Sequence, residues 1–110
     1  MARRARLGVT VKEFVRLEHV KHKYGLPHQR YLDMRRAQGG LCASCSKPQS
    51  AIYDDADSLC VDHSHATGTV RSLLCHRCNL LIGAIESSGR DTVTAALAYL
   101  NAHLQRERLG

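Results

Sequence analysis

Apolar residues recur every three or four positions in the first third of the chain, and this spacing predicts amphipathic helices. The first predicted helix spans residues 10–23, and its Thr10 and Glu13 have the spacing of a capping box. A second helix is expected to start at Pro27, which suits a first helical turn, and to end at Gly39-Gly40. The N-terminal part of the chain is therefore predicted to be helical.

The middle of the chain has a different pattern, with short apolar runs separated by turn residues. Leu59 to His63 and Val70 to Leu74 are predicted strands, and the turn at residues 66–69 joins them into a β-hairpin. A helix is expected to start near Cys75 and to end between Gly83 and Ser88. The polar and acidic residues 49–58 are predicted to form a loop.

Helical periodicity returns at the end of the chain. The last helix is expected from about Asp91, its predicted cap, to Gln105. Its apolar face is formed by Val93, Leu97, Leu100 and Leu104. Together the patterns predict an α+β fold with one structural domain in three parts. These parts are a basic helical arm over residues 1–40, a metal-bound core over residues 41–90, and a C-terminal helix over residues 91–110 that packs on the core.

Composition adds two constraints. A chain of 110 residues with four Tyr, one Phe and no Trp has little aromatic surface to bury, so we expect a further source of stability. We find no secretory signal in the opening residues 1–6 and no apolar run of membrane-spanning length. We therefore expect a cytoplasmic protein with no membrane contact, in which cysteines stay reduced and more often bind metal than form disulfides.

The net charge of +6 is distributed unevenly along the chain. Residues 1–40 contain ten Lys or Arg against three Asp or Glu, whereas the remainder is nearly neutral. A basic arm suits a polyanion such as DNA, although a solvated pair of charged helices explains the charge equally well. The basic residues that we expect to contact DNA are Arg3, Arg4, Arg6, Lys12, Arg16, Arg71 and Arg77.

Four of the five cysteines form two C-x-x-C pairs, Cys42 with Cys45 and Cys75 with Cys78. Two intervening residues allow both sulfurs of a pair to reach one ion, and zinc prefers four tetrahedral thiolates. The alternatives are buried free thiols or a redox pair, and the two paired motifs disfavour both. We predict a structural Zn²⁺ site, because four protein ligands leave no open position for a substrate. The fifth cysteine, Cys60, is predicted to be a small buried residue in a strand.

Polar residues of another kind lie between and directly after the cysteine pairs. Asp62 and Asn79 offer oxygen ligands for a hard cation such as Mg²⁺ or Mn²⁺. A neutral imidazole at His63 can accept a proton from water, and His65 follows two residues later. Adjacent strand residues point to opposite faces, so Asp62 and His63 can serve one phosphate only if the strand ends or bulges between them. The combination predicts metal-dependent hydrolysis of phosphodiesters.

The order C-x-x-C, V-D-H-x-H-A-T-G-x-V-R-x-L-L-C-x-x-C-N and L-x-G resembles the recombination endonuclease VII group of His-Asn-His nucleases. Lys23 to Leu26, Gln38 to Gly40 and Ala98 to Leu100 are also similar to that group. The resemblance implies a zinc-anchored ββα-metal core with flanking helices, and a phage or bacterial cytoplasmic setting. It also implies DNA cleavage that leaves 5′-phosphate ends, with branched or phage DNA as the substrate.

Residue by residue, the resemblance assigns structural zinc to the four paired cysteines, the catalytic metal to Asp62 and Asn79, and the general base to His63. His65 is placed near the phosphate. Ser64 and Ser72 depart from the acidic residue and the glycine that are common in the group at these positions. A homodimer is suggested by the resemblance and by the apolar stripes, which would serve equally for packing within one chain. The rival interpretation is a non-catalytic, zinc-stabilised DNA-binding module. That interpretation leaves four polar residues without a role, namely Asp62, His63, His65 and Asn79.

Overall fold

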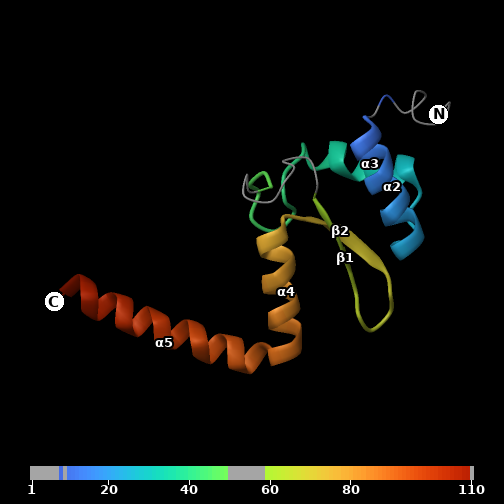
Figure 1. Ribbon diagram of the computed structural model, residues 1–110. Helices are drawn as coiled ribbons and strands as arrows, with labels where there is room; N and C mark the ends of the chain where they lie inside the picture. The colour runs from blue at the N-terminus through green and yellow to red at the C-terminus, as the bar shows by residue number, and fades with distance from the viewer. Residues whose placement is uncertain (1–7, 9, 50–58, 110) are drawn as a thin grey trace. The chain divides into compact units, whose positions relative to one another are not determined.

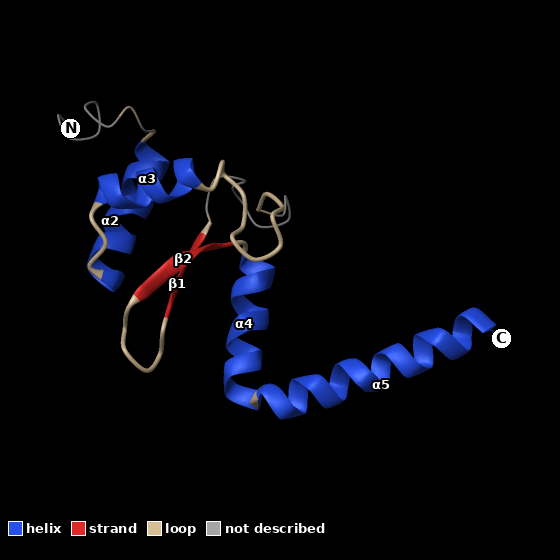
Figure 2. Ribbon diagram, turned by 180° about the vertical axis from the view of Figure 1, so that it is seen from behind, coloured by secondary structure: helices blue, strands red, loops and turns tan. Residues whose placement is uncertain are grey.

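The computed structural model describes residues 8, 10–49 and 59–109. The elements in chain order are α2 (Val11–Tyr24), α3 (His28–Ala37), β1 (Cys60–His63), β2 (Val70–Leu74), α4 (His76–Ser88) and α5 (Arg90–Leu109) (Figure 1, Figure 2). The two strands form one antiparallel sheet, so the described part of the chain confirms the α+β class. The chain divides into two compact units, Met1–Cys78 and Asn79–Gly110. The polar loop predicted over residues 49–58 lies, apart from Gln49, outside the described residues.

Helix α2 has the predicted cap at Thr10, and its bounds agree with the predicted ones to within one residue. The Thr10 hydroxyl accepts a hydrogen bond from the backbone N–H of Glu13 at 3.1 Å, which satisfies one of the free donors at the helix start. At the other end Gly25 adopts a left-handed conformation with φ 67°, and its N–H donates to the Lys21 carbonyl. This conformation favours glycine, so the helix stops at Tyr24 and the chain turns toward α3.

Helix α3 ties the N-terminal helices to the strand that follows. Helix α3 starts at His28, so Pro27 lies directly before the helix and not in its first turn as predicted. The helix ends at Ala37, shortly before the predicted end at Gly39-Gly40. The buried Tyr31 hydroxyl donates to the carbonyl of Leu59 at 2.7 Å. The guanidinium of Arg16 in α2 donates to the same carbonyl at 2.8 Å. Both helices therefore converge on the residue that leads into β1.

The β-hairpin contains an irregularity in the middle of the predicted catalytic sequence. Cys60 pairs with Leu74, and the register holds until Asp62 pairs with Ser72. His63 then pairs with Val70, so β2 contains one extra residue, Arg71, at a bulge between Asp62 and His63. Strand alternation predicted that β1 ends or bulges at Asp62 and His63; the extra residue lies in β2 instead, and β1 ends at His63. Strand β2 has its predicted limits, whereas β1 starts one residue later than predicted.

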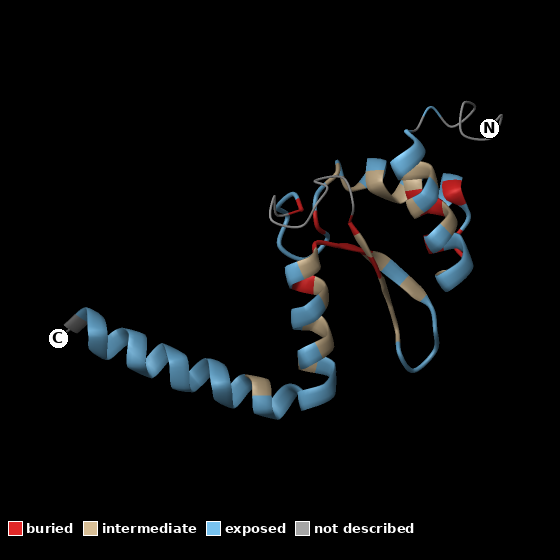
Figure 3. Ribbon diagram, in the orientation of Figure 1, coloured by how far each residue is buried: buried red, intermediate tan, exposed pale blue. Residues whose placement is uncertain are grey.

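The buried residues of the first unit gather where the helices meet the hairpin (Figure 3). They are Leu17, Val20, Leu26, Tyr31, Leu59, Val61, Leu73 and Leu74, together with Cys42, Cys75 and Cys78. The side-chain amide of Gln38 lies beside β2, where it donates to the Leu73 carbonyl at 2.9 Å and accepts from the Leu73 N–H at 3.0 Å. Gln38 thus satisfies the backbone of a strand residue that faces away from β1.

The second unit consists of most of α4 and the whole of α5. Gly89, with φ 89°, separates the two helices, and its carbonyl accepts from the N–H of Val93. Helix α5 is longer than predicted, and Asp91 lies in its first turn instead of capping it. The predicted cap was wrong because the helix starts one residue earlier, directly after the glycine. No helix in the described ranges is both long and apolar enough to cross a membrane.

Candidate metal centre and active site

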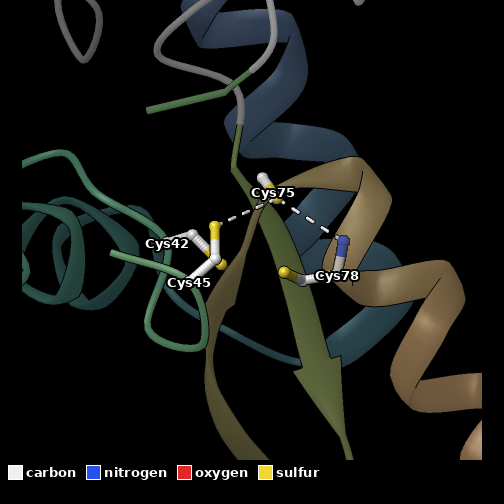
Figure 4. A group of neighbouring side chains, drawn as sticks. All are labelled: Cys42, Cys45, Cys75 and Cys78. Atoms are coloured by element: carbon white, nitrogen blue, oxygen red, sulfur yellow. Dashed lines mark hydrogen bonds between the residues drawn. The ribbon is translucent and has the colours of Figure 1, made fainter. Parts of the chain in front are cut away.

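The four paired cysteines come together at one end of the hairpin (Figure 4). Cys42 and Cys45 lie in the turn after α3, Cys75 joins β2 to α4, and Cys78 lies in the first turn of α4. All four sulfur atoms lie within 4.8 Å of one another, and those of Cys45 and Cys75 are 3.9 Å apart. Tetrahedral zinc with Zn–S bonds of about 2.3 Å requires sulfurs about 3.8 Å apart. The cluster therefore fits a zinc ion.

Backbone donors and a buried glutamine hold this cluster in place. The N–H of Ser44 points at the sulfur of Cys42 at 3.3 Å, and the N–H of Cys78 points at the sulfur of Cys75 at 3.4 Å. The carbonyl oxygen of the buried Gln49 side chain accepts from the N–H of His76 at 2.8 Å and so satisfies a free donor at the start of α4. Such bonds favour thiolates and fix their directions before any ion binds.

The thiols differ in their ease of ionisation. Burial opposes ionisation of Cys42, but hydrogen bonds from the backbone of Cys45, Cys75 and Ser44 outweigh it and lower its pKa to about 6. Burial, and then hydrogen bonds with the other three thiols, raise the pKa of Cys78 to about 12. A divalent cation at the centre favours the thiolate at every position. The fifth cysteine, Cys60, is half-buried in β1 outside the cluster, and burial raises its pKa.

At the bulge, Asp62 is engaged by the extra residue of β2. The Arg71 guanidinium donates from Nε to Oδ2 of Asp62 at 2.7 Å and from Nη2 to Oδ1 at 2.9 Å. The Asp62 side chain is 14% exposed and that of Arg71 is 39% exposed, so the pair lies at the edge of solvent. Arg71 was predicted to contact DNA, and its ion pair with Asp62 was not predicted because it depends on the register shift at the bulge.

His63 is packed between two aromatic side chains. Its ring centroid lies 5.3 Å from that of Tyr24, the last residue of α2, and 4.9 Å from that of His65 in the hairpin loop. The Nζ of Lys23 lies over the Tyr24 ring, 5.3 Å from its centroid. Tyr24 was named above only as part of the family resemblance and was given no role. Its contact with His63 could not be predicted from the spacing of residues in the chain.

Hydrogen bonds within the turn that contains His65 fix the conformation of the hairpin loop. The N–H of Ser64 donates to the Thr69 carbonyl at 2.8 Å, and the N–H of Gly68 donates to the Ser64 carbonyl at 2.7 Å. The Ser64 hydroxyl accepts from the N–H of Thr67. Ser64, one of the two departures from the family pattern, thus has a structural contact in the turn.

The predicted site residues fall into two sets. Asp62, His63 and His65 lie on the hairpin in the first unit, where the rings of His63 and His65 are in contact and the Asp62 carboxylate binds Arg71. Asn79 is half-buried in α4, directly after the cluster residue Cys78, and belongs to the second unit. The chain itself therefore links Asn79 to the cysteine cluster.

The predicted DNA contacts also divide. Lys12 in α2 and Arg77 in α4 are exposed. Arg16 has its guanidinium on the Leu59 carbonyl, which gives it a structural partner within the protein. Arg3, Arg4 and Arg6 lie outside the described residues.

Comparison with known proteins bears directly on this arrangement. The model of the recombination endonuclease VII family matches residues 17–102, which include the cysteine cluster, the hairpin and both flanking helical regions. The chain belongs to the recombination endonuclease VII family. This confirms the resemblance inferred from the cysteine and histidine motifs.

Two curated relatives are phage proteins. The "Gene 59 protein" of Mycobacterium phage D29 is 39% identical over 77 residues, which are 70% of this chain and 44% of that protein. The "Gene 59 protein" of Mycobacterium phage L5 is 39% identical over 56 residues, 51% of this chain and 32% of that protein. The chain thus spans less than half the length of either relative. No solved structure matches it significantly.

Proposed function

We propose that this endonuclease VII family member is a metal-dependent DNA endonuclease that hydrolyses phosphodiester bonds. The observation that carries the proposal is that β1 ends at His63, directly after Asp62, so the alternation of a regular strand stops where a carboxylate and an imidazole are needed together. His65 lies beside His63, and family membership supports nuclease chemistry.

In the proposed site each polar residue has one role. Asp62 and Asn79 supply oxygen ligands to Mg²⁺ or Mn²⁺, and such an ion, when bound, polarises the phosphate and stabilises the leaving oxygen. His63 accepts a proton from the attacking water, while the Tyr24 ring restricts its orientation. His65 contacts the phosphate.

The cysteine cluster has a separate, structural role in this proposal. Zn²⁺ bound by Cys42, Cys45, Cys75 and Cys78 joins the turn after α3 to the start of α4. Because β2 leads directly into Cys75, the ion would fix one end of the hairpin. A small chain with few buried aromatic residues gains rigidity from such an ion, and rigidity is what a catalytic site needs.

DNA phosphates are proposed to contact Lys12, Arg77, Arg71 and the basic residues Arg3, Arg4 and Arg6. Arg16 stays in this set, and one nitrogen of its guanidinium also donates to the Leu59 carbonyl. Binding that displaces counterions weakens with salt in proportion to the number of phosphates neutralised. Deleting residues 1–9 should therefore make the salt dependence of DNA affinity shallower, and an unchanged slope would exclude the tail from the interface.

The phage origin of the relatives supports action in the cytoplasm of an infected bacterium.

A homodimer is proposed to form through α5. Leu97, Leu100 and Leu104 are 56%, 53% and 50% exposed and lie on one face. In an antiparallel pair of α5 helices with Leu97 opposite Leu100, Arg90 lies opposite Glu107 of the second copy, whereas a parallel pair places Arg90 opposite Arg90. Mass measurement of wild type and Leu100→Glu tests this; a monomeric wild type would indicate packing within one chain.

The decisive test of the function is cleavage of junction, nicked and linear DNA with and without Mg²⁺, by wild type and by Asp62→Asn. Metal-dependent cleavage that leaves 5′-phosphate ends and disappears in Asp62→Asn supports the proposal. DNA binding without cleavage under any metal would favour the non-catalytic zinc module instead.

A further inference from the structure

The bulge places an internal cation on the carboxylate that the proposed function assigns to the catalytic metal. Arg71 is the extra residue of β2, and its guanidinium binds both oxygens of Asp62. We propose that Arg71 competes with the divalent metal for Asp62 in the DNA-free protein, and that a DNA phosphate relieves the competition by binding Arg71. This inference rests on the proposed function, because it needs Asp62 to be a metal ligand.

The competition follows from charge and geometry. A divalent ion at Asp62 must either displace the guanidinium or bind beside its fixed positive charge, and both lower the metal affinity. The pair is only partly exposed, so solvent screens this effect incompletely. Guanidinium groups also bind phosphates through two parallel hydrogen bonds, which makes a DNA phosphate an alternative partner of the same kind.

The consequence is coupling between metal and DNA. A phosphate that draws Arg71 away leaves the Asp62 oxygens to the metal, and the metal in turn leaves Arg71 to the phosphate. Linkage requires both effects to be equal in free energy, so each ligand should raise the affinity for the other. The device would keep the metal weakly held until substrate is present.

A purely structural role for the ion pair makes the opposite prediction. If Arg71 only orients the Asp62 carboxylate for the metal, its removal should weaken metal binding, because the ligand loses its fixed position. If Arg71 competes, its removal should strengthen metal binding. The sign of the change therefore separates the two roles without any measurement of activity.

The experiment titrates zinc-loaded protein with Mn²⁺ and measures free Mn²⁺ by its electron paramagnetic resonance signal. Arg71→Gln is compared with Arg30→Gln, an exposed α3 residue whose loss changes the net charge equally. Relative to wild type, Arg71→Gln should bind Mn²⁺ about five- to tenfold more tightly, the range expected of a partly exposed ion pair with bidentate geometry. Arg30→Gln should change the affinity less than about twofold.

A second measurement addresses the DNA. Binding of a short duplex is measured with and without Mn²⁺ in the His63→Ala background, which is expected to leave the DNA uncut. The factor by which Mn²⁺ tightens DNA binding should fall about five- to tenfold when Arg71→Gln is added, because linkage returns the same coupling.

Tighter Mn²⁺ binding by Arg71→Gln together with the smaller coupling factor supports the inference. Equal or weaker Mn²⁺ binding, or an unchanged coupling factor, overturns it while leaving the proposed nuclease intact. Asp62→Asn distinguishes the deeper failure: if it binds Mn²⁺ as wild type and Arg71→Gln do, Asp62 is not a metal ligand, and the site assignment under the proposed function falls with the inference.

Discussion

The two ends of the hairpin have opposite characters. At the end formed by Cys60 and Leu74, the neighbouring Val61, Leu73 and Leu74 are buried, Gln38 satisfies the strand backbone, and the cysteine cluster follows directly. At the end formed by His63 and Val70, the register is broken, both residues are half-buried, and the neighbouring Asp62 and Arg71 form an ion pair at the edge of solvent. One end is suited to hold the fold and the other to perform chemistry. A small domain thus separates stability from reactivity along only a few strand residues.

The largest expected effect is loss of the fold at the buried end. Cys75→Ser should release zinc and unfold or strongly destabilise the protein, because zinc binding to small modules is worth on the order of 10 kcal/mol and is coupled to folding. Zinc content and thermal unfolding measure this. Cys60→Ser is the matched control, since Cys60 lies outside the cluster and its loss should leave the zinc content unchanged. A folded wild-type sample without zinc would contradict the prediction.

The next effect belongs to the polar end and should spare the fold. His63→Ala should lower the cleavage rate about 100- to 10,000-fold, the usual contribution of a general base, while zinc content and unfolding temperature stay close to wild type. Single-turnover cleavage of one DNA substrate gives the rate. His19→Ala removes an exposed histidine of α2 and should cut at the wild-type rate. Normal cleavage by His63→Ala would remove the distinction between the two ends.

The contrast between the ends also explains what the sequence could predict. Spacing alone located the cysteine cluster, the limits of β2 and the cap at Thr10, because each depends on residues close together in the chain. Strand alternation at Asp62 and His63 indicated that β1 ends or bulges there, and β1 ends at His63. These are local constraints, and the structure meets them.

Contacts between distant segments could not be read from spacing. The pairing of Gln38 with Leu73 joins residues 35 positions apart, and the contact of Tyr24 with His63 depends on where α2 meets the hairpin. Arg71 is nearer in sequence to its partner Asp62, but the contact requires the register to shift by one residue. Tertiary packing decides all three contacts, and it also decides the contact of the Arg16 guanidinium with the Leu59 carbonyl.

A smaller effect on stability should distinguish two glutamines of the same helical region. Gln38→Ala should lower the free energy of unfolding by about 1–3 kcal/mol, because the N–H of Leu73 loses its acceptor inside the protein. The Leu73 carbonyl keeps a donor in the N–H of Ala43. Gln29→Ala removes an exposed bond to Asp33 and should cost less than about 0.5 kcal/mol. Equal losses in urea unfolding would show that Gln38 does not anchor the buried end.

The smallest expected effect concerns Tyr31, whose hydroxyl binds the carbonyl before β1. Tyr31→Phe should cost about 1 kcal/mol, since Leu59 keeps the Arg16 guanidinium as a donor. Burial raises the pKa of Tyr31, so the folded state holds this proton more tightly than the unfolded state does. The resulting stability is complete below the unfolded pKa of about 10 and is lost as the pH rises through the folded value. Urea unfolding at pH 8 to 10.5 should therefore show the advantage of wild type over Tyr31→Phe shrinking only above about pH 10. An advantage that stays constant across this range would mean that the phenol contributes no proton-linked stability, and that the buried end is held by its apolar contacts and the cysteine cluster alone.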